Sequence, residues 1–291
     1  MTDYRGGMTV VTKERSDADA RITGDPAPRQ LIVTLFGLYG RAEKNWLSVA
    51  ALVRLMGELG VDGPAVRSSI SRLKRREVLA SSRRGTSAGY SMSPWLLDVL
   101  AEGDARIFGR TRASIDDGWL VVVFSVPESE RENRHALRTE LTRLGFGTAA
   151  SGVWIAPGNI EREVRETLER RDLHRYVDIF NGSHFALGDL RSKVRDWWDL
   201  DELTALYAEF IDAYRPILKQ SDKDGFTPGE AFAHYVEMLT MWRRLPYRDP
   251  GLPLDLLPDG WNSVVAEELF RELNAALSGP AREHALETIH P

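Results

Sequence analysis

Basic and hydroxyl side chains recur along residues 62–76, which begin at Asp62 and end in Lys-Arg-Arg. At about 100° per residue, Val66, Ile70 and Leu73 fall on one side of a helix. Guanidinium and hydroxyl groups fall on the other side, and such groups suit phosphates and base edges. The pattern predicts a DNA-recognition helix, with candidate contacts at Arg67, Ser68, Ser71, Arg72, Lys74 and Arg75.

The segments before this stretch favour a DNA-binding domain over a merely solvated basic face. An apolar segment over residues 29–40 predicts a first helix. Ser48 is placed to cap a second helix, which Gly60 ends. A short turn then leads to Asp62, and Pro64 sits in the first turn of the third helix, where a missing N–H costs little. The second and third helices therefore have the spacing of a helix-turn-helix.

A short basic hairpin is expected directly after the third helix. Residues 78–82 and 89–92 predict two strands, and residues 83–88 predict the turn between them. Arg83 and Arg84 lie in that turn, from which they could reach the DNA backbone or minor groove. Three helices and this hairpin predict a winged helix-turn-helix. A winged-helix module that binds protein instead of DNA is an alternative.

Charge is distributed unevenly along the chain, although the net charge is −5. Residues 29–115 hold 14 Lys and Arg against 7 Asp and Glu, a local charge of +7. Residues 196–291 hold 8 Lys and Arg against 18 Asp and Glu, a local charge of −10. The first region suits a polyanion such as DNA, and the second repels one.

Composition limits the class of protein. The 291 residues are enough for two or three domains. Cysteine is absent, which excludes disulfides and thiolate metal sites and fits the cytoplasm. The sequence has no apolar run of about 18 residues and no apolar signal-peptide core near its start. We therefore expect a cytoplasmic protein without a membrane span.

The middle of the chain alternates between strand and helix patterns. Strands are expected over residues 119–126, 146–156 and 176–180, the second of them as a strand or hairpin, with a further segment at 184–187. Helices are expected over residues 130–144 and 161–170. This β-α-β(β)-α-β order predicts a ferredoxin-like α+β sandwich.

The remaining residues look helical, except for a proline-rich segment over residues 245–253. Within it, Arg248 and Asp249 have two interpretations. Arg248 could pair with a nearby carboxylate and fix the loop, which we favour. Alternatively the corner could bind an anionic effector, with Arg248, Asp249 and Trp261 as effector contacts.

Enzymatic alternatives have weak support. Residues 85–89 match G-x-S-x-G, but the buried strand and following helix that a nucleophile elbow requires are missing. The six histidines form neither H-x-H nor H-E-x-x-H spacing, so we expect no metal and no cofactor. A hydrolase or nuclease that uses the middle or C-terminal region is the remaining catalytic alternative.

Three groups of residues resemble the PaaX family of phenylacetate-catabolism repressors and their relatives. The first region contributes residues 35–37, 66–76 and 90–92. The middle contributes residues 119–127 and 144–147. The most specific match is Leu-Pro-Tyr-Arg-Asp-Pro-Gly-Leu-Pro at 245–253, followed by Leu257-Pro258 and Trp261.

The resemblance implies a homodimer that binds a palindromic operator and represses a catabolic operon. It also implies release of the operator on binding an aryl- or acyl-CoA thioester such as phenylacetyl-CoA. The middle domain looks like the CRISPR adaptation nuclease fold, in which an aspartate ends the first strand. Here that strand ends Phe124-Ser125-Val126-Pro127, so nuclease activity is not carried over.

The expected architecture is therefore a multidomain α+β protein. A mobile tail (1–28) precedes a winged-helix DNA-binding domain (29–93) and a connector helix (94–115). A ferredoxin-like middle domain (116–192) and an all-helical C-terminal domain (193–291) follow. No catalytic residue is expected.

Overall fold

A computed structural model of the chain describes residues 26–183 and 188–291. The described residues form two compact units. The first contains the residues up to Phe108 together with Glu209–Arg243 and Val265–Pro291. The second contains Gly109–Ala208 and Arg244–Val264. The helical C-terminal region is thus shared between the two units.

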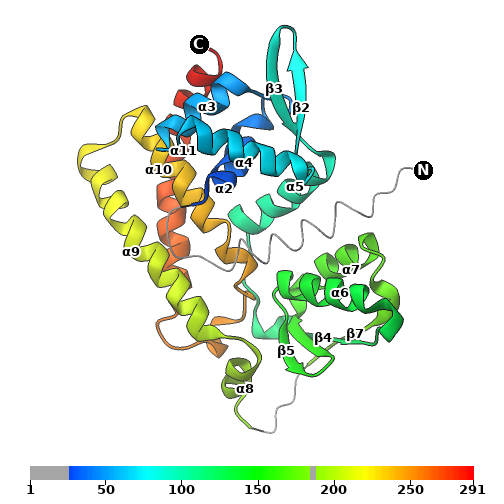
Figure 1. The fold of residues 1–291 in the computed structure, drawn as a ribbon. Helices are drawn as coiled ribbons and strands as arrows, with labels where there is room; N and C mark the ends of the chain where they lie inside the picture. The colour runs from blue at the N-terminus through cyan, green and yellow to red at the C-terminus, as the bar shows by residue number, and fades with distance from the viewer. Residues whose placement is uncertain (1–25, 184–187) are drawn as a thin grey trace. The chain divides into compact units, whose positions relative to one another are not determined.

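The first unit begins with helices around a small antiparallel sheet (Figure 1). Helix α2 (Pro28–Leu35) continues into a π-helical turn over Phe36–Gly40. Then follow β1 (Leu47–Ser48), α3 (Val49–Glu58), α4 (Gly63–Arg75), β2 (Leu79–Arg84) and β3 (Ser87–Met92). The sheet has the order β1-β3-β2, and both pairings are antiparallel.

Local chemistry explains where α3 begins and ends. The Ser48 side chain accepts a hydrogen bond from the Ala51 backbone N–H at 3.0 Å and caps the helix, as expected. Gly60 adopts a φ of 73°, a left-handed conformation that glycine tolerates after a helix. Leu52, Leu55 and Met56 are fully buried. The apolar face of α3 therefore holds it to the core of the unit.

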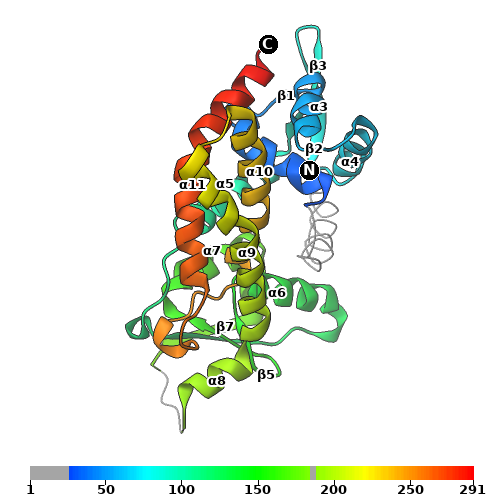
Figure 2. The ribbon, with the colours of Figure 1, turned by 90° about the vertical axis from the view of Figure 1, so that its left-hand side faces the viewer.

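Three longer helices complete the first unit. They are α5 (Pro94–Phe108), the later part of α9 (Leu200–Asp224) and α10 (Pro228–Trp242), and α11 (Ser263–Ile289) runs beside α10 (Figure 2). The rings of Trp242 and Phe270 stack at 4.4 Å with 9° between their planes. Trp242 Nε1 also donates to the backbone oxygen of Ile107 at 3.1 Å. These contacts join α10 to α11 and to the end of α5.

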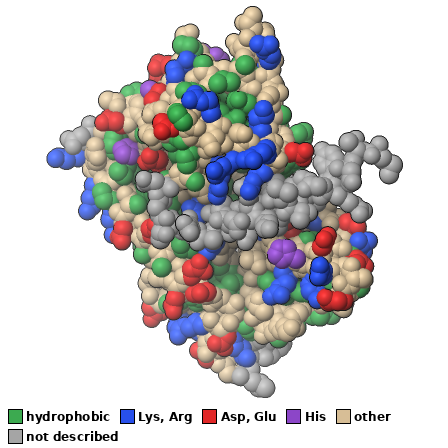
Figure 3. Space-filling model, in the orientation of Figure 1, with side chains coloured by type: hydrophobic (Ala, Val, Ile, Leu, Met, Phe, Trp, Pro, Cys, Tyr) green, Lys and Arg blue, Asp and Glu red, His purple; other side chains and the backbone are tan. Residues whose placement is uncertain are grey.

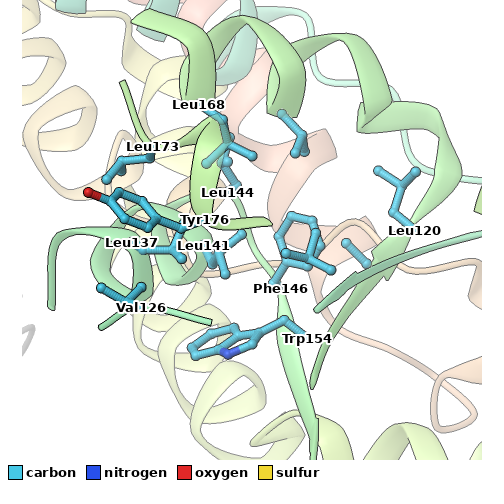
Figure 4. Packing of buried hydrophobic residues seen from close by; sticks show 13 residues of the cluster. Leu120, Val126, Leu137, Leu141, Leu144, Phe146, Trp154, Leu168, Leu173 and Tyr176 are labelled. Atoms are coloured by element: carbon cyan, nitrogen blue, oxygen red, sulfur yellow. The ribbon is translucent and has the colours of Figure 1, made fainter. Parts of the chain in front are cut away.

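The second unit contains a four-stranded antiparallel sheet of order β5-β6-β4-β7. Its elements are β4 (Trp119–Phe124), α6 (Arg131–Arg143), β5 (Gly147–Ala150), β6 (Val153–Pro157), α7 (Glu161–Arg170) and β7 (Val177–Gly182). On one face, Leu120 and Val122 pack with Leu137 and Leu141 of α6 and Val164 of α7. Figure 4 shows part of this core.

The opposite face of the same sheet is also covered. Trp119 and Ile155 project there, because neighbouring residues of a strand point to opposite faces. They pack with Trp198, which follows α8 (Leu190–Trp197), and with Leu252 and Trp261 from the later segment of the unit. Both faces of the sheet are therefore buried.

The mixed α+β class and the helical C-terminal region agree with the sequence-based prediction. The expected strand or hairpin at 146–156 is a hairpin made of β5 and β6. The connector helix, expected to reach about Arg112, ends at Phe108 because Arg110 and Arg112 bind the 245–253 segment. Most of the expected tail, residues 1–25, and the segment 184–187 lie outside the described residues.

Candidate nucleic-acid interface

Helix α4 has the two faces that its sequence predicts. The Asp62 carboxylate accepts a hydrogen bond from the Ala65 N–H at 2.7 Å and caps the helix. Val66, Ile70 and Leu73 are buried against the unit. All six predicted contacts on the helix are exposed: Arg67, Ser68, Ser71, Arg72, Lys74 and Arg75. The structure therefore presents them together on one solvent-facing surface.

The β2–β3 hairpin is longer than the sequence indicates. Its strands reach Arg84 and Ser87, which leaves Gly85-Thr86 as the turn. Arg83 is exposed on β2. Arg84 is held by the body of the unit, since it donates to the Lys44 backbone oxygen at 2.7 Å and lies 5.0 Å from the Trp46 ring centroid. The two arginines therefore sit on a strand and in different environments.

Four arginines surround a hollow of about 520 Å³ in the same unit. Arg72, Arg75 and Arg76 come from the end of α4, and Arg29 comes from the first turn of α2. Figure 3 shows Lys and Arg side chains gathered on the face that carries α4. Sequence reasoning missed Arg29 and Arg76, because no spacing rule links the start of α2 to the end of α4.

The predicted effector residue Asp249 is the centre of a buried network in the second unit. Its carboxylate is 1% exposed and lies 3.2 Å from Arg112 and 3.8 Å from Arg110. It also accepts hydrogen bonds from Tyr207 Oη at 2.8 Å and from the Gly251 N–H at 2.6 Å. Burial by itself would raise the pKa of Asp249, but Arg110 and Arg112 outweigh it and keep this pKa below its ordinary value.

The other two predicted effector residues lie in the same unit and have structural partners. Arg248 forms an ion pair with Glu202, the arrangement favoured from sequence. Trp261 is buried, and its ring lies 6.5 Å from that of Tyr207. Effector binding by Arg248, Asp249 and Trp261 stays a prediction.

The catalytic and metal alternatives gain no geometric support. Ser87, the centre of the G-x-S-x-G match, lies on β3 of the hairpin and not on a strand-to-helix turn. Within residues 26–183 and 188–291, no cluster of three or more His, Asp or Glu could hold a metal ion. In the same residues, every helix is too short or too polar to cross a membrane.

Comparison with known proteins shows matches along most of the chain. Three family models match: PaaX-like protein at residues 27–95, PaaX protein central Cas2-like domain at 112–194, and PaaX-like protein C-terminal domain at 198–287. The transcriptional repressor PaaX of Escherichia coli (strain K12) is 28% identical over 249 residues, which cover 82% of this chain and 77% of the relative.

A solved structure shares the fold. The uncharacterized protein Rv0674 from Mycobacterium tuberculosis has a TM-score of 0.52 and 24% sequence identity. The match covers 87% of this chain and 97% of the other. At this identity it supports the fold alone.

Proposed function

Because the chain belongs to the PaaX family of transcriptional regulators, we propose that it is a sequence-specific repressor acting through a winged helix-turn-helix. The observation that carries this proposal is the fully exposed row of basic and hydroxyl side chains on α4. Helices α2, α3 and α4 and the sheet β1-β3-β2 supply the elements that such a domain needs. The family consists of regulators, and we assign no catalytic role.

The exposed face of α4 would enter the major groove, where side chains read base edges. Arg83 would contact the backbone or minor groove from the hairpin. This arrangement also favours DNA over a protein partner, because guanidinium groups side by side suit a polyanion. The neighbouring residues 29–115 carry the local charge of +7.

We propose a ferredoxin-like fold for the sheet of the second unit. The strand order β5-β6-β4-β7 and the sequence β-α-β-β-α-β support it. β4 ends at Phe124 and is followed by Ser-Val-Pro, so a carboxylate at the strand end, which a nuclease of this class would use, is replaced.

We further propose that the repressor is a cytoplasmic homodimer on a palindromic operator of a catabolic operon. An aryl- or acyl-CoA thioester such as phenylacetyl-CoA would release it. The name of the E. coli relative supports repression. The effector, the dimer and the operator come from the family resemblance.

A gel shift with the DNA upstream of this chain's own gene, titrated with acyl-CoA thioesters, tests the function. We expect a shift that one thioester reverses. Arg72→Ala should weaken binding and flatten its dependence on salt, because fewer counterions are released. No shift with any genomic fragment at low salt would contradict DNA binding. A shift that no thioester reverses would contradict the proposed class of effector.

A further inference from the structure

The hollow between the ends of α2 and α4 concentrates positive charge from two separate helices. Arg29, Arg72, Arg75 and Arg76 line it. An arginine side chain stays protonated in proteins, so four positive charges share this space. Arg29, Arg72 and Arg75 form no side-chain ion pair or hydrogen bond with any residue in the described ranges. Their mutual repulsion therefore leaves the hollow suited to an anion.

Helix stability accounts for only part of this cluster. The end of a helix carries partial negative charge, which favours the basic residues Arg72, Lys74 and Arg75 in the last turn of α4. The start of a helix carries partial positive charge, which disfavours a cation there. Arg29 nevertheless lies in the first turn of α2, which has no acidic residue. The position of Arg29 is therefore unfavourable for α2 but suitable for a ligand.

We propose that this hollow binds backbone phosphates of the DNA that α4 reads. The inference rests on the proposed function and assigns part of its chemistry. Guanidinium groups bind phosphate oxygens in pairs of parallel hydrogen bonds, and groups from two helices can approach one phosphate from two sides.

The proposal divides α4 into two parts. Residues near the start of a recognition helix contact base edges, which assigns Arg67, Ser68 and Ser71 to sequence reading. Arg72 and Arg75, with Arg29 and Arg76, hold the backbone. Phosphate contacts fix the register of a protein on DNA but carry no sequence information directly. Arg29 should therefore contribute affinity without specificity.

Arg29→Gln tests the proposal, because this residue lies outside α4 and is only half-buried. Arg282→Gln removes the same charge from an exposed position on α11 and is the control. Binding of the full chain is measured at several salt concentrations with the upstream DNA and with a random duplex of equal length. At about 0.1 M salt, Arg29→Gln should lose about tenfold in affinity for both, and its salt slope should fall by about 0.9. Arg282→Gln should match the wild type.

The outcomes separate this proposal from the function on which it rests. If the wild type binds neither duplex, the DNA-binding function itself fails. If the wild type binds and Arg29→Gln retains its affinity and salt slope, only the phosphate site is overturned. A loss confined to the upstream DNA would make Arg29 a base-reading residue, which also overturns it.

A free anion is the competing occupant. Thermal melting with inorganic pyrophosphate at constant ionic strength measures it. Stabilisation that Arg29→Gln abolishes, together with unchanged DNA binding, would assign the hollow to a small phosphate compound and overturn the DNA assignment. Equal melting curves for the two proteins without ligand are expected and show that Arg29→Gln folds.

Discussion

At the scale of single residues, Asp249 is the group whose loss should damage the fold most. It is a buried carboxylate held by two arginines, a tyrosine and a backbone N–H. Asp249→Asn leaves Arg110 and Arg112 without their counter-charge, and we expect the free energy of unfolding to fall by about 3 kcal/mol. Tyr207→Phe removes one hydrogen bond to a charged group, so about 1.5 kcal/mol is expected. Urea unfolding measures both, and equal stabilities for the wild type and Asp249→Asn would contradict the network.

The same carboxylate should make stability depend on pH in acid. Its pKa is lower in the folded chain than in the unfolded chain. The unfolded state therefore binds the proton first, and the contribution is complete above the unfolded value of about 3.9 and is lost as the pH falls through the folded value. Urea unfolding between about pH 2 and pH 6 should show a smaller loss of stability in Asp249→Asn than in the wild type. Parallel curves would show that Asp249 does not titrate differently on folding.

The two hairpin arginines should differ in their effect on DNA binding. Arg83 is exposed on β2, whereas Arg84 is engaged by the Lys44 backbone oxygen and the Trp46 ring. We expect Arg83→Ala to weaken binding about tenfold at about 0.1 M salt. Arg84→Ala should have a smaller effect on affinity and should cost about 0.5 kcal/mol of stability. Fluorescence anisotropy with labelled duplex measures the affinities, and the reverse order would make Arg84 the hairpin's DNA contact.

At the scale of elements, the approach of β3 to β1 depends on Gly89, which pairs with Ser48. A Cβ at Gly89 would lie 2.5 Å from the Leu47 carbonyl oxygen and would also overlap the Trp46 ring. Gly89→Ala should therefore destabilise the sheet by about 2 kcal/mol and weaken DNA binding with it. Gly57 on α3 has no atom within 4 Å of an added Cβ, so Gly57→Ala should be neutral or stabilise by about 0.5 kcal/mol. Thermal melting compares them, and equal effects would contradict this packing.

Elements set by local chemistry were predictable from the sequence. The Asp62 cap, Pro64 and the stripe of Val66, Ile70 and Leu73 are all local signals, and the expected helix at 62–76 is found at Gly63–Arg75. The end of α5 was not predictable in this way. It depends on Arg110 and Arg112 reaching a segment about 140 residues away, and periodicity carries no such information.

The candidate site was predictable to a similar extent. The exposed face of α4 follows from helical spacing, because the residues that read DNA and those that pack lie on one helix. The basic hollow does not follow, since Arg29 reaches it only through the packing of α2 beside α4. The separate surroundings of Arg84 likewise depend on Trp46, which precedes it by almost 40 residues.

At the scale of the whole molecule, the sequence locates the opposite charges but not the units that carry them. The acidic residues 196–291 are divided between the two units, and only part of them joins the basic first region. Periodicity shows that α10 has a buried face. It does not show that Trp242 of this helix meets Ile107 and Phe270. Long-range partners of this kind determine which helices form one unit.

The proposed dimer makes a geometric prediction for its operator. Two copies of α4 in successive major grooves require half-sites about 34–36 Å apart, which is one turn of DNA. An insertion of 5 base pairs between the half-sites turns one of them by about half a turn. We therefore expect binding to fall to the level of a single half-site. An insertion of 10 base pairs should restore the facing of the grooves, and any binding it restores measures how far the dimer can extend. Gel shifts on the footprinted operator give the affinities, and sedimentation velocity gives the mass. A monomeric protein whose binding tolerates the 5-base-pair insertion would show that each chain reads DNA alone.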